Sequence, residues 1–168
     1  MKKTILVLFF FLPFVLLNAQ ETESKELRQA PNFELEDIDG DFIELSEMVG
    51  DGPILVSFWA TWCKPCIEEL GYFKEIYEKY HAKGMQMLAI STDNEKTVAK
   101  VKPFVKTKNY PFRVLLDTNS EVSRLYYAQA VPFSVIIDKS GKVVFSHLGY
   151  KKGDELEVEE IIQKLLKE

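Results

Sequence analysis

The stretch that decides the fold of this chain is residues 54–66, which read ILVSFWATWCKPC. Its first six residues form a nearly continuous apolar run, the pattern of a β-strand that is buried on both faces. The remainder contains the only two cysteines of the 168-residue chain, Cys63 and Cys66. We therefore expect the cysteine pair to lie where a buried strand ends and the next element begins.

A helix is predicted directly after this strand, from about Cys63 to Lys83. Its apolar and aromatic positions recur at steps of three and four residues, and Gly84 supplies a C-terminal stop. Residues 85–90 then form a second apolar strand. This order makes a βαβ unit, which implies parallel strands and a right-handed crossover. A sheet with helices on both faces follows.

The segment before the central strand predicts a β-hairpin. Apolar and acidic side chains alternate over 33–38, an Asp-Gly turn occupies 39–40, and the chain returns over 42–45. Ser46 is expected to cap a short helical turn that ends at Gly50.

The second half of the chain continues to alternate helices and strands. Asp93 or Asn94 is expected to cap a helix that reaches about Lys108, with a break or a late start caused by Pro103. The remaining expected elements are a strand over 112–116, a short helix over 117–127, an antiparallel hairpin of strands 133–138 and 142–147, and a final amphipathic helix with apolar positions from Leu156 to Leu166. No repeat or linker divides residues 30–168, so we predict one α/β domain with a mixed central sheet.

Residues 1–19 have the layout of a secretory signal. Two lysines open the chain, residues 4–17 carry no charge, and Ala19 offers a small residue for cleavage. The run is shorter than the roughly 20 residues that span a bilayer as a helix, and an uncleaved anchor is the alternative. We expect residues 20–29 to form a flexible tether, and the chain to be exported to the periplasm or the extracytoplasmic cell envelope, where cysteines can be oxidised.

Composition places the chain among ordinary globular proteins, with 46% hydrophobic and 28% charged residues and a net charge of −5. This acidic balance lacks the basic footprint of nucleic-acid binding, so no nucleic acid is expected as a partner. Contact with a membrane is expected only if the N-terminal segment is retained. A monomer is the default state for such a domain.

The cysteine pair predicts thiol–disulfide chemistry. Two intervening residues on a first helical turn, Lys64 and Pro65, bring the two sulfurs within bonding distance. The free N–H groups and the dipole of a helix N-terminus stabilise a thiolate there. We expect Cys63 to be the exposed nucleophile, and Cys66, one turn further in, to be covered and to resolve a mixed disulfide. Pro65 suits the first turn because its missing N–H has no helical partner in any case.

Two other interpretations of the cysteine pair are weaker. A structural disulfide across so short a loop removes little entropy from the unfolded chain, so it stabilises poorly. A zinc site needs further ligands, and neither His81 nor His147 belongs to a second metal-binding motif. His147 is interpreted as a structural histidine on a strand. We therefore predict a redox-active Cys63–Cys66 disulfide with no metal and no other cofactor.

The segment FWATWCKPC at 58–66 resembles the active-site segment of thioredoxin-like proteins. Val131-Pro132 before an apolar strand resembles the family's cis-proline loop, and Gly149 after the last strand also fits. The likeness is greatest to the TlpA/ResA-like branch of exported thiol–disulfide oxidoreductases. The N-terminal hairpin and a central insertion at about 94–118 resemble that branch's additions to the thioredoxin fold.

The resemblance implies roles for further residues. Pro132 would be cis and face the cysteines, Val131 would pair its backbone with an extended substrate, and Trp62 would help to form an apolar docking patch. Ser57 occupies the strand position where thioredoxin has a buried Asp. By the same resemblance, Glu69, three residues after the second cysteine, would be the proton handler for Cys66, with a solvated helix surface as the alternative.

Function follows from the same resemblance. The branch commonly keeps extracytoplasmic cysteines reduced, so we expect a reductant of protein disulfides, such as those of apocytochrome c, with an unidentified partner that recharges it. The motif alone does not fix the direction of electron flow. The alternatives are a peroxiredoxin-like thiol peroxidase, which would want a T-x-x-C setting where Ala60 stands, and a non-catalytic exported binding domain.

Overall fold

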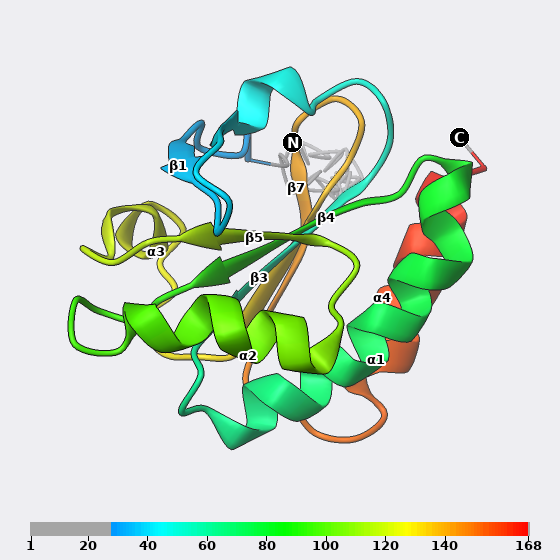
Figure 1. Ribbon diagram of the computed structural model, residues 1–168. Helices are drawn as coiled ribbons and strands as arrows, with labels where there is room; N and C mark the ends of the chain where they lie inside the picture. The colour runs from blue at the N-terminus through cyan, green and yellow to red at the C-terminus, as the bar shows by residue number, and fades with distance from the viewer. Residues whose placement is uncertain (1–27, 168) are drawn as a thin grey trace, which may run out of the picture.

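The computed structural model describes residues 28–167, and its central sheet has five strands in the order β5-β4-β3-β6-β7 (Figure 1). The elements are β1 (Glu34–Glu36), β2 (Phe42–Glu44), η1 (Leu45–Glu47), β3 (Ile54–Trp59), α1 (Lys64–Tyr80), η2 (His81–Lys83), β4 (Gln86–Ser91), η3 (Val98–Lys100), α2 (Val101–Lys108), β5 (Arg113–Leu116), α3 (Glu121–Leu125), β6 (Phe133–Ile137), β7 (Val143–Leu148) and α4 (Asp154–Leu165), where η marks a 3-10 helix. The predicted signal at 1–19 and most of the predicted tether at 20–29 lie outside the described residues.

The predicted βαβ unit is confirmed. β3 pairs in parallel with β4, and α1 connects the two strands. β5 extends the parallel half, whereas β6 and β7 add an antiparallel half, so the sheet is mixed. The Asp-Gly hairpin is also present, since β1 pairs antiparallel with β2 beside the main sheet.

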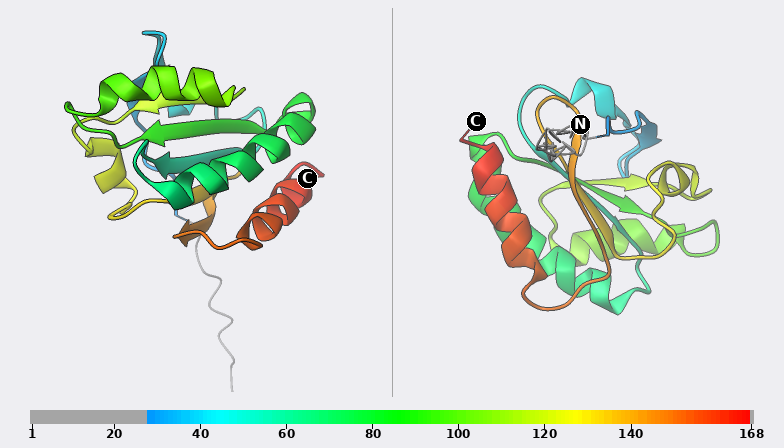
Figure 2. Two further views of the ribbon diagram at one scale, coloured as in Figure 1. Left: turned by 60° about the horizontal axis from the view of Figure 1, so that its bottom comes forward. Right: turned by 180° about the vertical axis from the view of Figure 1, so that it is seen from behind.

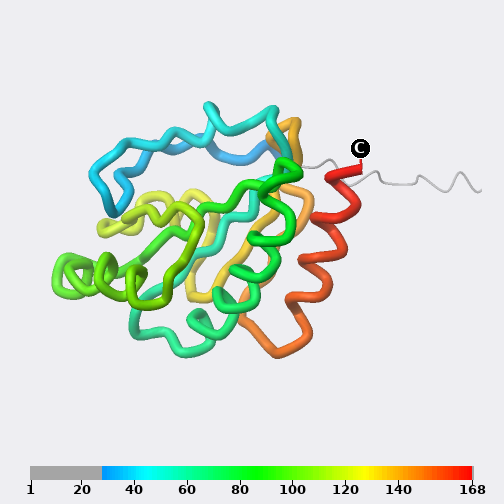
Figure 3. Tube along the Cα trace, turned by 45° about the vertical axis from the view of Figure 1, so that its right-hand side comes forward, coloured from blue at the N-terminus to red at the C-terminus, as the bar shows by residue number. Residues whose placement is uncertain are grey.

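Two apolar layers cover the two faces of the sheet. On one face, alternate strand positions such as Leu55 and Ile136 pack against α1, α2 and α4. On the other face, Val56 and Val135 pack against α3 and the N-terminal hairpin segment. Figure 2 shows α4 beside α1, and Figure 3 shows the N-terminal segment (blue to cyan) and α4 (red) on different sides of the sheet. The expected helices on both faces are therefore confirmed.

Two glycines meet where the chain enters β3 and leaves α1. Gly84 adopts a φ of 103° directly after η2, a left-handed conformation that favours glycine. A Cβ atom on Gly52 would come within 2.2 Å of the Gly84 carbonyl oxygen. This close backbone approach sets the start of β3 against the end of the crossover, and no larger residue fits at Gly52.

Two predicted helix caps are wrong. η1 already includes Ser46, whose hydroxyl donates to the Glu44 carboxylate at 2.6 Å instead of capping. α2 begins only at Val101, after η3, so neither Asp93 nor Asn94 caps it. The Asn94 carboxamide oxygen accepts the N–H of Lys96 at 3.0 Å in the turn before η3, and the Asp93 carboxylate binds Thr61. The late start expected from Pro103 is confirmed.

The ends of the domain differ slightly from expectation. Arg28 and Ala30 pair through backbone hydrogen bonds with the β6–β7 hairpin, at 2.9 Å each, so the end of the predicted tether belongs to the ordered domain. α3 is shorter than the helix predicted over 117–127 because the Asp117 carboxylate accepts the backbone N–H of Val122 and so holds the first turn at 121. Within residues 28–167, no helix is both long and apolar enough to cross a membrane.

Candidate active site

Cys63 and Cys66 form a disulfide at the N-terminus of α1, with an S–S distance of 2.02 Å and 5.3 Å between the Cα atoms. Cys63 is the N-cap residue, and its sulfur accepts the backbone N–H of Cys66 at 3.2 Å. The predicted position of the pair, between a buried strand and a helix, is confirmed. A sulfur held against free helical N–H groups is the arrangement that stabilises a thiolate once the bond is reduced.

The two sulfurs differ in accessibility, although less than expected. Cys66 is completely buried and Cys63 is 6% exposed, so the exposed nucleophile predicted from the sequence is nearly covered in the oxidised state. The reason is local, because the Cys63 sulfur turns back over the first turn of α1 to bond Cys66. Lys64 and Pro65 lie exposed on that turn, and Trp62 projects into solvent with 63% of its surface exposed.

A buried carboxylate holds the loop that leads into Cys63. Asp93 is fully buried, and it accepts both the backbone N–H and the hydroxyl of Thr61 at 2.7 Å. The Ser91 hydroxyl donates to the same carboxylate at 3.0 Å. Because Trp59 and Ser91, the last residues of β3 and β4, are register partners, both parallel strands end at the same end of the sheet. Sequence reasoning missed this role, for which the signal was an acid directly after the second parallel strand.

The Val131–Pro132 peptide bond is cis, as predicted. It precedes β6, whose first residue Phe133 pairs with Phe58 near the end of β3, so the proline loop and the cysteine loop lie at the same end of the sheet. Val131 packs against the apolar cluster that contains both cysteines. The carbonyl oxygen of Pro132 accepts the N–H of Gly149 at 2.8 Å, which ties the loop to the end of β7.

Glu69 is buried, with 2% of its surface exposed. The hydroxyls of Ser57 and Ser134 donate to the same oxygen, Oε2, at 3.1 and 3.2 Å. The alternative of a solvated surface residue is therefore wrong for Glu69, whereas the adjacent Glu68 is exposed. Ser57, which stands where thioredoxin has an acid, binds the acid that α1 supplies three residues after Cys66.

The environment of Glu69 shifts its protonation into the neutral range. Burial raises the pKa of Glu69 to about 7, the hydrogen bonds from Ser57 and Ser134 act in the opposite direction, and the nearby Asp154 adds a smaller increase. A carboxyl group with such a pKa can both take up and release a proton near neutral pH, which is the requirement for a general acid and base.

The two histidines lie in different settings. His81 follows α1, and its Nδ1 lies 3.0 Å from the carbonyl oxygen of Tyr77. His147 lies on β7, and its Nε2 is 3.1 Å from the Asp154 carboxylate. In the part of the chain that the structure describes, no group of three His, Cys, Asp or Glu residues is placed to hold a metal ion.

Comparison with known proteins gives consistent relatives. A family profile described as the AhpC/TSA family matches residues 27–146. The protein named thiol-disulfide oxidoreductase ResA of Bacillus anthracis is 38% identical over 130 residues, which cover 77% of this chain and 73% of that protein. The protein of the same name from Bacillus subtilis (strain 168) is 34% identical over 143 residues, covering 83% and 78%.

Solved structures agree with the sequence relatives. A protein described as a putative thiol:disulfide interchange protein DsbE from Chlorobium tepidum superposes with a TM-score of 0.76 at 30% identity, covering 83% of this chain and 96% of that one. A thioredoxin-like protein of Porphyromonas gingivalis gives 0.70 at 32% identity, covering 82% and 91%. With its disulfide at the head of α1, this chain belongs to the AhpC/TSA family of thioredoxin-like proteins and is a thiol–disulfide oxidoreductase related to those named ResA.

Proposed function

We propose that this protein is an exported dithiol reductant, which opens disulfides in extracytoplasmic proteins by exchange with Cys63 and Cys66. The observation that carries the proposal is a disulfide at the N-terminus of α1 with a buried, titratable carboxyl group, Glu69, one turn further along the same helix. The likeness to proteins named thiol-disulfide oxidoreductase supports it.

The first step uses Cys63. In the reduced protein its thiolate attacks one sulfur of a substrate disulfide, the substrate S–S bond breaks, and one substrate thiolate leaves. The Cys66 N–H, which lies 3.2 Å from the Cys63 sulfur in the oxidised state, and the helix dipole favour the attacking thiolate. A mixed disulfide between Cys63 and the substrate results.

The second step uses Cys66 and Glu69. The ionised Glu69 carboxylate takes the proton of the Cys66 thiol, and the Cys66 thiolate attacks the Cys63 sulfur. The mixed disulfide breaks, the second substrate thiolate leaves, and the Cys63–Cys66 bond forms, so two electrons have passed to the substrate. The hydroxyls of Ser57 and Ser134 orient the carboxylate for this transfer.

The substrate is proposed to be an extended protein segment. Trp62 offers an exposed aromatic surface next to Cys63, and the Val131–Pro132 loop lies at the same end of the sheet. Backbone pairing with Val131 would give affinity with little sequence preference, as in β-augmentation. Disulfides of apocytochrome c before haem attachment belong to this substrate class.

The proposed compartment is the periplasm or extracytoplasmic envelope. The basic start, the uncharged run at 4–17 and the small residue Ala19 support export. An oxidising compartment would continually convert the dithiol to the disulfide, so the proposal requires a membrane or envelope partner that returns two electrons to Cys63 and Cys66.

The reduction potential of the Cys63–Cys66 couple tests the direction of electron flow. The protein is equilibrated in thiol–disulfide buffers of graded poise, and the reduced fraction is measured by alkylation. A value below about −220 mV supports a reductant, whereas a value near about −120 mV marks an oxidant that makes disulfides. Cys63→Ser should abolish disulfide exchange with a model protein; retained cellular function in that variant would favour the non-catalytic binding domain instead.

A further inference from the structure

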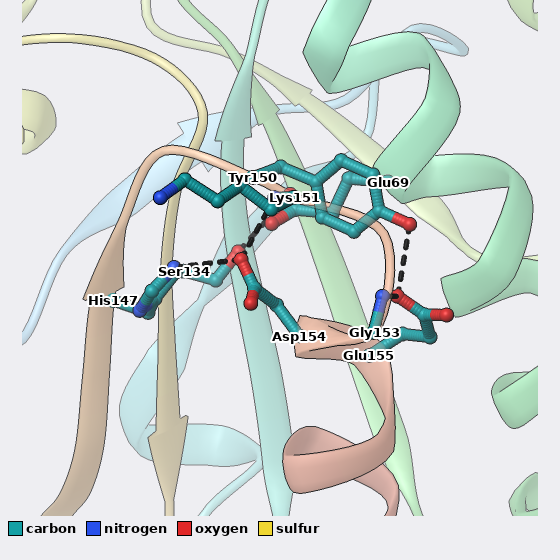
Figure 4. A network of polar contacts seen from close by, with 8 residues as sticks. All are labelled: Glu69, Ser134, His147, Tyr150, Lys151, Gly153, Asp154 and Glu155. Atoms are coloured by element: carbon teal, nitrogen blue, oxygen red, sulfur yellow. Dashed lines mark hydrogen bonds and ion pairs between the residues drawn. The ribbon is translucent and has the colours of Figure 1, made fainter.

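Three polar side chains form a row across the antiparallel half of the sheet. Ser57 on β3 pairs in register with Ser134 on β6, and Ser134 pairs with His147 on β7. Register partners in adjacent strands place their side chains on the same face. The row therefore runs from the buried centre of the sheet to its edge strand, on the face that α1 and α4 cover. Figure 4 shows two of its members, Ser134 and His147.

Two carboxylates from different helices lie over this row. Glu69 of α1 accepts the hydroxyls of Ser57 and Ser134 at the buried end. Asp154, the first residue of α4, lies 3.1 Å from Nε2 of His147 at the outer end and also accepts the N–H of Lys151 at 2.8 Å. The His147 and Asp154 side chains are 38% and 33% exposed, so this contact meets solvent, whereas Glu69 is buried.

Several charged or titratable groups surround Glu69. On its own helix, Cys66 precedes it by three residues and the exposed Glu68 is adjacent. The neighbouring elements contribute His147 from β7, Tyr150 and Lys151 from the β7–α4 loop, and Asp154 and Glu155 from α4 (Figure 4). Glu155 is engaged by the Tyr150 hydroxyl and the Gly153 N–H, at 2.9 and 2.8 Å. Asp154 is the neighbouring acid whose charge raises the pKa of Glu69, and the Nε2 atom of His147 lies 3.1 Å from its carboxylate.

We propose that the His147–Asp154 pair controls how readily Glu69 holds its proton, and so sets the pH range in which Cys66 can be deprotonated. Neither residue touches the sulfurs, so both are positioning residues. The inference rests on the proposed function only for its consequence at Cys66.

The coupling has a definite sign. When His147 is neutral, the charge of Asp154 is uncompensated and favours the protonated form of Glu69. When His147 gains a proton, it offsets Asp154, and the ionised Glu69 persists to lower pH.

The test follows the Glu69 carboxyl group directly. The oxidised full-length protein is labelled with ¹³C at glutamate carboxyl groups, Glu69→Gln assigns the Glu69 resonance, and its midpoint is measured by NMR against pH. Asp154→Asn keeps the hydrogen-bonding shape and removes the charge, so it should lower the midpoint. His147→Gln removes the counterion and should raise it.

Glu157→Gln is the matched control, because it removes the same charge from the exposed side of the first turn of α4. A midpoint that moves equally in Glu157→Gln and Asp154→Asn, or in neither, overturns the inference. A separate result would contradict the proposed function. Glu69→Gln would exchange disulfides as fast as the unmodified protein, while Asp154→Asn and His147→Gln shift the Glu69 midpoint as expected. Shifts in opposite directions for Asp154→Asn and His147→Gln, with the control unmoved, support it.

Discussion

Glu69 is balanced between two opposing effects. Burial removes water from the carboxylate and favours the neutral acid, whereas the two hydroxyl donors, Ser57 and Ser134, favour the ion. With its pKa near 7 the group is present in both forms at neutral pH. A side chain in this condition suits a thiol that must lose its proton during exchange and regain it on reduction.

Replacing Glu69 with Gln should therefore slow the resolving step. The variant keeps the volume and hydrogen-bonding capacity of the side chain but cannot accept the Cys66 proton, so single-turnover reduction of a mixed disulfide should fall by about 10²-fold at neutral pH. In the unmodified protein the rate should rise through pH 7 as Glu69 ionises, and this rise should be absent from the variant. Stopped-flow fluorescence of the nearby tryptophans across a pH series measures both effects.

Glu68→Gln provides the control for this prediction, because Glu68 is exposed on the same turn. Its rate and pH profile should match those of the unmodified protein. Equal rates in all three proteins would show that another group, or water, deprotonates Cys66.

The contrast between Glu68 and Glu69 also shows what a sequence can establish at this scale. Cysteine spacing and helix periodicity located Cys63 and Cys66 correctly, because these signals are local. The burial of Glu69 depends on hydroxyls that lie 12 and 65 residues away in the chain, on β3 and β6. Periodicity alone could not decide whether Glu69 lies beside Cys66 or on the solvent-exposed surface of the helix.

At the scale of elements, the parallel pair β3 and β4 positions the reactive loop. Both strands end at the same end of the sheet, where the Asp93 carboxylate, after β4, accepts the N–H and the hydroxyl of Thr61, after β3. A further bond, from the Thr92 N–H to the Trp59 carbonyl oxygen at 2.8 Å, joins the same two strand ends. The start of α1 is thus anchored by the neighbouring strand as well as by its own cap.

Asp93→Ala should loosen this anchor. The Thr61 N–H would lose its acceptor in a region where Asp93 is fully buried, so the free energy of unfolding should fall by about 2–4 kcal/mol. Urea denaturation of the oxidised protein measures the loss. Asn94→Ala, a change at an exposed neighbour, should cost much less; an equal loss in both variants would contradict a specific role for Asp93.

The sequence could not distinguish this anchor from a helix cap. An acid followed by Asn94 and a basic helical stretch carries the usual signal of an N-terminus, and only the register of Trp59 with Ser91 brings Asp93 to Thr61. The error has a physical cause, since a short polar side chain serves a loop or a helix equally well until the strand pairing is known.

At the scale of the molecule, the strand pattern predicted most of the architecture. The bounds of β3, the βαβ unit and both hairpins were predicted because each depends on short-range hydrophobic periodicity or turn chemistry. The assignment of α2 to the same face as α1 and α4 was not predicted, because it depends on contacts between distant segments. That crowded face is the one that encloses Glu69.

The burial of Glu69 makes the free energy of unfolding of the whole molecule depend on pH. Its pKa rises from 4.5 to about 7 on folding, so the folded state holds the proton more tightly than the unfolded state. The associated stability is fully present below about pH 4.5 and is lost as the pH rises through 7. At about 1.4 kcal/mol per pKa unit, the loss is on the order of 3 kcal/mol.

The free energy of unfolding of the oxidised protein should therefore fall between about pH 5 and 8 by this amount relative to Glu69→Gln, which has no proton to lose. Urea denaturation at a series of pH values measures the difference, and other groups that titrate in this window largely cancel between the two proteins. Glu68→Gln should keep the full decline. Parallel curves for the unmodified protein and Glu69→Gln would mean that the folded protein relaxes to hydrate the ionised carboxylate, and that the row of hydroxyls beneath it opens to water as the pH rises.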